Sequence, residues 1–375
     1  MTTQMKQQLT PEARSALFQH FKNDDIKEGR LSHYGISRPH SLRLMIVSSD
    51  FCDATRHALK HSTLQITSRQ GSESRWEFVT LNSRTSASAQ ALIALVQPKF
   101  GCLAIRRPKE FETEMDEQFV RRHFVGIPKL TVESDVGLRP HIHRLIVLMA
   151  PKLRSLTCNA KYLERTGDFP LLKLNDCKLC SCNHKEPLNM DLLLAHRIEK
   201  IQLDLVRSAE NPKLVLSENG LVQPALKELV LDDWSDFPLL MPQIFYKRVP
   251  NLKKQIHLIR LRCFYAASVP GVLKRLQTLA EHGQAVLQAN TNIEKLVYNA
   301  DISTGRNVDM EEHLKIWQQT RFFANGKFSV LSKDQLREYE DAPEFNINYA
   351  NATKVFVVSN GKMKFFVCVH ISPHS

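Results

Sequence analysis

The densest group of potential metal ligands in this sequence is a short run of cysteines that ends in a histidine. Its members are Cys177, Cys180, Cys182 and His184. Two thiolates spaced Cys-x-x-Cys fit two of the four tetrahedral positions around a zinc ion. No second Cys-x-x-Cys pair follows at a distance, and the run comes directly after a predicted strand. We therefore expect thiols in a loop or the core, with zinc as the alternative and no other cofactor.

Residues with catalytic spacing are scarce. His141 and His143 are placed by their alternation on one face of a strand, without a nearby carboxylate or thiol. The sequence contains no His-Glu-x-x-His zinc motif, no Gly-x-Ser-x-Gly elbow and no P-loop. With only 13 glycines, the chain has little material for loops that cradle phosphates. The sequence predicts a protein that is not an enzyme.

Positive charge is concentrated in one part of the chain. The formal net charge is +12, and the stretch 245–278 contains lysines and arginines but no Asp or Glu. Within it we single out Lys253, Lys254, Arg260 and Arg262 as a basic patch for a partner. An acidic protein segment is the expected partner. A solvated face is the plain alternative. Nucleic acid, stacked on Phe245, Tyr246, Phe264 and Tyr265, is a less favoured one.

A loose Leu-x-x-Leu-x-Leu pattern recurs through the middle of the chain. In this pattern the last two apolar residues lie on one face of a strand, and each unit buries that face against its neighbours. The copies begin at Leu153, Phe169, Ile198, Leu226, Ile256 and Ile293. Spacings of 28, 30 and 37 residues from Ile198 onward make the array irregular. A compact α/β domain without repeats is the alternative.

Two further elements can be predicted, one between these strands and one after them. Apolar residues from Val269 to Ala280 follow helical spacing, with Pro270 near the start. At the C-terminus, Val- and Phe-rich runs flank Asn360-Gly361, which is a strong hairpin signal. We expect two antiparallel strands that close the edge of the sheet.

The N-terminal region has the pattern of short helices. Thr10 and Pro11 suit a helix start, and Leu9, Ala13, Leu17 and Phe21 recur every fourth residue. A second amphipathic helix is predicted from Leu42 to Lys60. Two or three short helices bury little surface by themselves. We therefore expect this module to dock on a partner.

The run Leu9-Thr10-Pro11-Glu12 and the later run Leu42–Phe51 resemble the F-box motif. That motif opens with Leu-Pro-x-Glu and later carries Leu-Arg-Leu-Val-Ser-Lys-x-Trp/Phe. The stretch 345–370 is similar to the end of the F-box-associated region of nematode-type F-box proteins, with its Asn-Gly turn and Phe/Val-rich strand. The resemblance implies a substrate receptor of an SCF-type ubiquitin ligase, which binds a Skp-type adaptor and, through it, a cullin.

The adaptor-binding residues expected from this resemblance are apolar. They are Leu9, Pro11, Leu17, Phe18, Phe21, Leu44, Val47 and Phe51. The fold expected is α/β: a helical F-box-like module at 1–62, then an irregular leucine-rich-repeat-like array at 63–375 that ends in a β-hairpin. The array would hold an unidentified protein substrate. A protein-binding scaffold without a ligase role is the alternative.

The composition agrees with a globular chain, which is 43% hydrophobic and 24% charged. The polar start, Met1–Gln8, lacks the apolar core of a secretory signal, and apolar runs are too short to span a membrane. We expect a cytoplasmic or nuclear protein.

Overall fold

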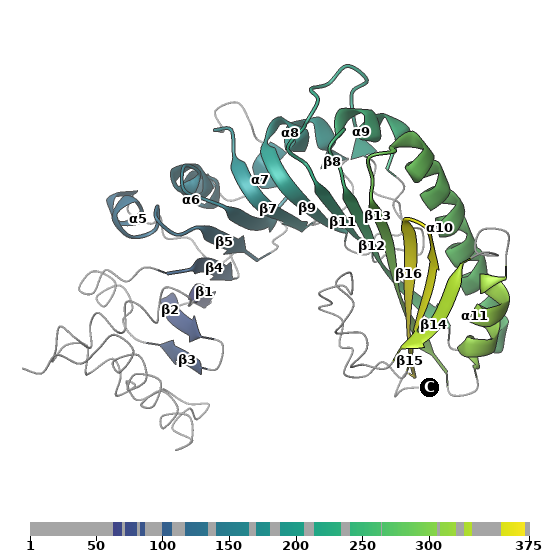
Figure 1. Cartoon of the computed structure of the whole chain (residues 1–375). Coiled ribbons are helices and arrows are strands. Elements are labelled where there is room, and N and C mark those ends of the chain that lie inside the picture. The colour runs from purple at the N-terminus through teal and green to yellow at the C-terminus, as the bar shows by residue number, and fades with distance from the viewer. Residues whose placement is uncertain are drawn as a thin grey trace, which may run out of the picture. The chain divides into compact units, whose positions relative to one another are not determined.

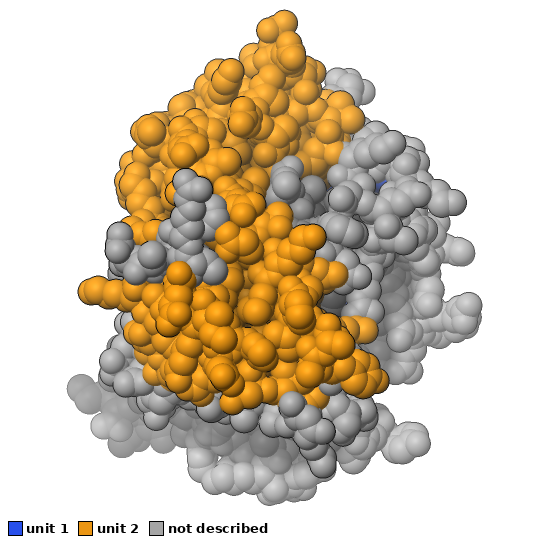
Figure 2. Space-filling model, turned by 90° about the vertical axis from the view of Figure 1, so that its right-hand side faces the viewer, with its two compact units in different colours: residues 1–162, 167–173 blue, residues 163–166, 174–375 orange. Residues whose placement is uncertain are grey.

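The computed structural model describes most of the chain after residue 62. The described ranges are 63–69, 72–80, 83–86, 100–106, 117–133, 140–164, 170–180, 188–205, 214–233, 241–263, 265–305, 308–319, 326–331 and 354–371. They fall into two compact units, coloured separately in Figure 2. Unit 1 is 1–162 with 167–173, and unit 2 is 163–166 with 174–375. The F-box-like module, its eight proposed contact residues and the boundary after residue 62 lie outside the described residues and stay predictions.

Unit 1 contains a six-stranded run of a mixed sheet. Its strands lie in the order β6-β5-β4-β1-β2-β3. They are β1 (Thr63–Arg69), β2 (Ser72–Thr80), β3 (Ser83–Ser86), β4 (Cys102–Arg106), β5 (Lys129–Val132) and β6 (Ser155–Asn159). Strands β1, β4, β5 and β6 are parallel, whereas β2 and β3 add antiparallel hairpins. Helices α5 (Glu117–His123) and α6 (Pro140–Met149) connect the parallel strands (Figure 1).

Unit 2 contains the longer run, in the order β14-β15-β16-β13-β12-β11-β9-β7. These strands are β7 (Lys173–Cys180), β9 (Arg197–Leu205), β11 (Glu228–Asp233), β12 (Lys254–Cys263), β13 (Lys295–Thr304), β14 (Lys327–Leu331), β15 (Lys354–Asn360) and β16 (Met363–Ile371). From β9 to β13 and on to β16 the pairing is parallel, and β15 and β14 are antiparallel. The predicted α/β architecture with mainly parallel strands is confirmed.

The connections of unit 2 place its helices on one face of the sheet (Figure 1). They are α8 (Met190–Ala195), α9 (Gln243–Arg248), the short 3-10 turn η2 (Ala266–Ser268), α10 (Val269–Ala289) and α11 (Met310–Gln318). A separate two-stranded sheet pairs β8 (Leu188–Asn189) with β10 (Leu214–Val215). Helix α7 (Lys161–Glu164) has residues in both units. No described helix has the length and apolar character needed to cross a membrane.

Strand pairing fixes the true register of the repeated apolar pattern. In unit 2 the pattern begins at Ile198, Leu226, Leu252 and Ile293, because Lys200, Glu228, Lys254 and Lys295 are register partners. The predicted copy that begins at Ile256 is therefore shifted by four residues from the true start at Leu252. Its correct inward positions hold Gln255 and His257, both fully buried. In unit 1 the same pattern begins at Phe100, Ile127 and Leu153, all buried.

The leucines predicted to be buried are buried. Leu156, Leu203, Leu229, Leu231, Ile259, Leu261 and Leu296 are all at most 3% exposed. In the predicted copy that begins at Phe169, the two described leucines, Leu172 and Leu174, are buried, and further along β7 Cys177 and Leu179 are buried as well.

An aromatic row under α10 and α11 anchors the helices to three adjacent strands. His257, Tyr298 and Phe365 are register partners, and their rings stack with centroids 4.7 Å and 4.6 Å apart. Trp317 of α11 meets Phe365 edge to face at 5.3 Å, and His282 of α10 meets His257 at 6.2 Å. Such pairs contribute beyond the area that they bury. The row therefore locks the helical layer to β12, β13 and β16.

Three further sequence predictions have clear outcomes. The helix after Val269 is confirmed and extends to Ala289, with Pro270 in its first turn. The C-terminal hairpin is confirmed, with Gly361 at φ +56° in its turn. It does not close the edge, because β14 pairs outside β15 and β16 pairs inside with β13. His141 and His143 lie in α6, not in a strand, so two residues apart they do not share a face.

Gly283 tests the packing of α10. A Cβ at this position would lie 2.9 Å from the Tyr298 hydroxyl and 2.9 Å from the Met363 methyl. We expect Gly283→Ala to destabilise the protein, because overpacking costs about 1–3 kcal/mol and the helix-propensity gain is only about 1 kcal/mol. Gly271→Ala, in the same helix with open space around it, is the control and should stabilise by about 0.4–1 kcal/mol. Urea unfolding measures both, and equal effects of the two substitutions would contradict the packing.

The buried histidines predict sensitivity to acid. Burial, with the nearby His282, lowers the pKa of His257 to about 3, and burial also lowers the pKa values of His282 and His196. Because the folded-state pKa lies below the unfolded value near 6.5, stability is complete above that pH and is lost as the pH falls toward 3. Each such histidine adds up to about 1.4 kcal/mol per pH unit to the slope. In His257→Phe the slope between pH 6 and 4.5 should become shallower, and an unchanged slope would refute the assignment.

Candidate functional site

The face of the unit 2 sheet opposite the helices carries side chains in straight rows. We call it the helix-free face, since no described helix covers it (Figure 1). Register pairs place Asp204 beside Asp232, Arg260 beside Asp301, and Ser303 beside His370. Side chains of register partners point to the same face of a sheet. The rows therefore follow directly from parallel pairing.

Polar contacts join several neighbouring members of these rows, and we call the whole set the charged ladder. Its members are Lys178, Asp204, Asp232, Arg260, Asp301, Ser303 and His370, from six neighbouring strands. Lys178 Nζ lies 3.3 Å from Asp204 Oδ2, and an Arg260 guanidinium nitrogen lies 2.9 Å from Asp232 Oδ1. His370 Nδ1 lies 2.9 Å from Asp301 Oδ1, and His370 Nε2 lies 2.7 Å from Ser303 Oγ. Six strands at about 4.8 Å spacing give the ladder a length of about 24 Å.

The ladder is half-buried, which strengthens the electrostatic interactions between its charged groups. Burial raises the pKa of Asp232, against Arg260, while the neighbouring Asp204 raises it further. Burial likewise raises the pKa of Asp301, although His370 and Arg260 act in the opposite direction. The side chains of Lys178, Asp204 and Arg260 keep 29%, 20% and 25% of their surface exposed. These groups stay accessible to a partner in a region of low dielectric, where charge complementarity discriminates strongly between partners.

The rest of the helix-free face is mostly apolar, both toward the amino ends of the strands and further along the row of Asp204 and Asp232. Val230, Ile256, Val297, Val357 and Phe366 form one buried cluster. Leu258 and Leu331 pack against it and are only partly buried. Because this cluster is already covered, contact with a partner on this face must rest on the polar rows.

The structure separates the four residues of the predicted basic patch. Lys253 and Lys254 lie at the amino end of β12, and Arg260 and Arg262 lie about 20 Å away at its carboxyl end. Lys253 pairs with Glu294 at 2.5 Å, and Arg260 pairs with Asp232. Arg262 is exposed and has no ion pair among the described residues. The patch is thus two small sites of different character.

The cysteine run does not converge. Cys177 is buried on one face of β7, and Cys180, three residues on, belongs to the opposite face. Burial raises the pKa of the Cys177 thiol, which disfavours the thiolate that zinc requires. Cys182 and His184 lie outside the described residues. The described groups of His, Cys, Asp and Glu include no cluster suited to a metal ion.

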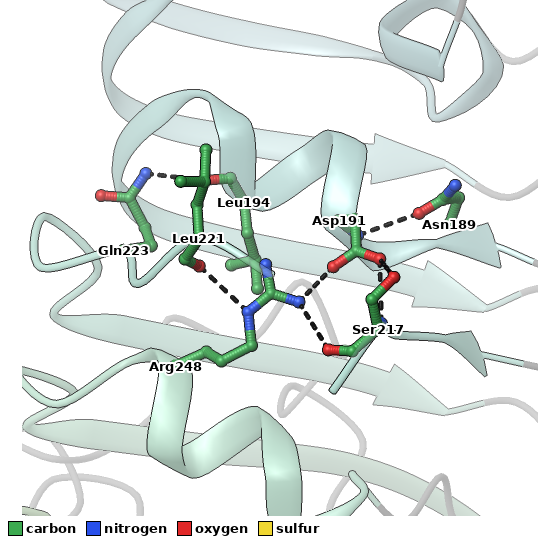
Figure 3. Close-up of polar contacts among 7 residues, drawn as sticks. All are labelled: Asn189, Asp191, Leu194, Ser217, Leu221, Gln223 and Arg248. Atoms are coloured by element: carbon green, nitrogen blue, oxygen red, sulfur yellow. Dashed lines mark hydrogen bonds and ion pairs between the residues drawn. The ribbon is translucent and has the colours of Figure 1, made fainter. Parts of the chain in front are cut away.

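A second polar cluster, built around Arg248 of α9, has a structural role (Figure 3). Its guanidinium forms an ion pair with Asp191 of α8 and donates to the carbonyl oxygens of Leu221, at 3.0 Å, and Ser217, at 3.3 Å. Asp191 Oδ2 also accepts from the Ser217 amide at 2.9 Å and from its hydroxyl at 2.5 Å. Although burial opposes it, the hydrogen bonds from Ser217 and Arg248 lower the pKa of Asp191. Arg248 lies in the predicted basic stretch but is buried.

Gln223 adds to the contacts of this cluster. We call Arg248, Asp191, Ser217 and Gln223 together the Arg248 clamp, which holds the segment 214–225. Its side-chain amide donates to the carbonyls of Leu194, at 3.0 Å, and His196, and its backbone amide donates to the Arg248 carbonyl at 2.7 Å. A Cβ at Gly220 would overlap the Arg248 guanidinium, so this position requires glycine. The clamp holds two exposed apolar residues, Leu221 and Val222, at the surface.

Comparisons with known proteins add no identity to this geometry. No protein-family model matches the chain, and no curated protein matches it significantly.

Sequence reasoning found Arg260 and Arg262 but missed their acidic partners. The missed signal is the residue after the second inward leucine in each copy, which is Asp204 after Leu203 and Asp232 after Leu231. Aligning the copies at Leu226 and Leu252, rather than at Ile256, places these aspartates in one row with Leu258. Arg260 follows Leu258 by two residues on the same face of β12.

The clamp predicts an asymmetry between two adjacent basic residues. Arg248→Ala leaves the Asp191 carboxylate without its guanidinium and frees the segment 214–225. We expect a loss of about 3–5 kcal/mol, as for other broken buried ion pairs. Lys247→Ala, the exposed neighbour, is the control and should cost less than about 0.5 kcal/mol. Chemical denaturation checks both, and similar losses would show that the Arg248 contacts do not stabilise the fold.

Proposed function

We propose that this chain is a non-catalytic substrate receptor of an SCF-type ubiquitin ligase. The N-terminal module would bind a Skp-type adaptor, and the strand–helix array would bind the target protein. The charged ladder on the helix-free face is the observation that carries the second half of this proposal. The resemblance of Leu9–Glu12 and Leu42–Phe51 to the F-box carries the first half.

The ladder suits the recognition of another protein. It spans about 24 Å, which is more than a small ligand needs and less than a full protein interface. Its charges follow a fixed order, with a cation at Lys178, two anions at Asp204 and Asp232, and a cation at Arg260. A fixed order of charges selects a partner with the complementary order and repels others.

The repeated strands support an irregular leucine-rich-repeat-like array. Pattern starts lie 27 and 26 residues apart in unit 1 from Phe100 to Leu153, and 28 and 26 residues apart in unit 2 from Ile198 to Leu252. These values fall within the 20–29 residues of leucine-rich repeats. The step from Leu252 to Ile293 is 41 residues, because it contains α10. Such arrays present one face for binding.

The geometry favours this function over nucleic-acid binding. The basic residues needed for a phosphate-binding stripe are divided between two ends of β12, and several lysines pair with neighbouring glutamates. A protein-binding scaffold without a ligase role uses the same face, and adaptor binding distinguishes it.

Two variants separate the two halves of the proposal. Leu17→Ala with Phe21→Ala should stay folded and lose co-purification of the Skp-type adaptor and cullin from cells. Asp204→Lys should keep the adaptor and lose target binding, because it places a cation beside Lys178 in the ladder. Glu281→Lys makes the same charge change on the exposed surface of α10 and serves as the control.

Quantitative mass spectrometry of the purified complexes is the measurement. If wild-type protein brings down no adaptor, the ligase proposal fails and the scaffold replaces it. If Asp204→Lys and Glu281→Lys lose the same partners, or neither loses any, the ladder does not bind the target.

A further inference from the structure

Three polar residues occupy equivalent positions at the carboxyl ends of adjacent parallel strands. Arg262, Ser303 and His370 are each the second-last residue of β12, β13 and β16, which lie side by side (Figure 1). They are register partners, so their side chains form one row on the helix-free face. Carboxyl ends of parallel strands are where open α/β sheets bind ligands.

Two contacts of the His370 ring decide how this row can donate. Its Nδ1 lies 2.9 Å from Asp301 Oδ1. When the neutral ring carries its proton on Nδ1, Nε2 accepts the Ser303 hydroxyl proton at 2.7 Å. When the ring gains a proton, Nε2 donates to Ser303 Oγ instead, and the hydroxyl proton turns outward. Protonation of His370 thus converts Ser303 into a donor toward the surface.

Arg262 supplies the second donor. Arg260, two residues earlier on the same face, is held by Asp232, whereas Arg262 is exposed and has no ion pair among the described residues. A guanidinium fork matches the geometry of carboxylate and phosphate oxygens. With about 4.8 Å between strands, one oxyanion can reach both Arg262 and Ser303.

The contacts of His370 with Ser303 and Asp301 bring together the three residue types of a Ser–His–Asp triad. The backbone around Ser303 does not suit nucleophilic catalysis. Acyl transfer needs peptide N–H groups free to stabilise an oxyanion beside the serine. Ser303 and Thr304 are paired in register with β12 on one side and β16 on the other. The row is therefore better suited to bind an anion than to react with an ester.

We propose that Arg262, Ser303 and His370 bind an oxyanion, a carboxylate or a phosphate group, and that binding takes up one proton at His370. The charged groups that face His370 are Asp301 of β13 and Arg260 and Arg262 of β12, while β15 contributes the apolar Val355. An anion held by Arg262 places a negative charge beside the His370 ring, which favours proton uptake there. Binding should therefore strengthen as the pH falls.

Purified full-length protein, with 13C-labelled histidine rings, tests the proposal by NMR without any ligase partner. Sulfate, which keeps its charge between pH 5.5 and 8, represents a phosphate group, and acetate represents a carboxylate. At constant ionic strength set with sodium chloride, we expect saturating sulfate to raise the titration midpoint of His370 by about 1 pH unit. Sulfate binding should be at least about five-fold tighter at pH 6 than at pH 8.

Arg262→Gln and Ser303→Ala should each weaken sulfate binding at least about five-fold. Lys274→Gln removes one exposed positive charge from the helical face and should change nothing. A response to sulfate alone assigns the site to phosphate groups, and a response to acetate as well assigns it to carboxylates. If neither anion shifts His370 beyond the chloride control, if Arg262→Gln binds like wild type, or if a fluorophosphonate probe labels Ser303, the proposal is overturned.

Discussion

Parallel pairing in a single register is the constraint on which the other features of unit 2 depend. From β9 through β11, β12 and β13 to β16, each strand aligns its first inward residue with that of its neighbour. Side chains on both faces therefore fall into rows that cross the strands. On the helix-covered face one row becomes the stack of His257, Tyr298 and Phe365. On the other face the equivalent rows become the charged ladder. A slip of one residue in any strand would exchange the two faces, so core and candidate site are fixed together.

Much of the fold was predictable from sequence, because most inward positions are aliphatic. The helix after Val269 and the hairpin around Gly361 follow from local signals alone. The predicted copy at Ile256 is misaligned because Gln255 and His257 fill the inward positions where leucine is expected, whereas Ile256 and Ile259 imitate the pattern four residues later. The β1–β3 hairpins were missed because they lack the repeat. Only the basic half of the site was predictable. The run of basic residues on one strand identifies Arg260 and Arg262, but it does not show which aspartates of neighbouring strands lie beside them.

Burial explains why basic residues of similar sequence context play different roles. Arg248 is enclosed by Asp191 and backbone carbonyls and stabilises a loop, so its positive charge is paired inside the protein. Arg260 pairs with Asp232 but remains partly exposed at the surface. Arg262 is exposed and free of internal ion pairs in the described residues, and is the one of the three best able to meet an external anion. This gradation decides which of the three can act in recognition, because unpaired or half-paired charges discriminate between partners.

The Arg248 clamp has a consequence for the order of folding. Its ion pair joins residues 57 positions apart, and its other contacts join segments about half as distant in sequence. Closing such loops costs entropy before any contact compensates for it. The segment 214–225 therefore cannot become ordered until α8 and α9 have both docked on their strands. We expect it to gain protection from hydrogen exchange late in refolding, and at the same moment for all its amides.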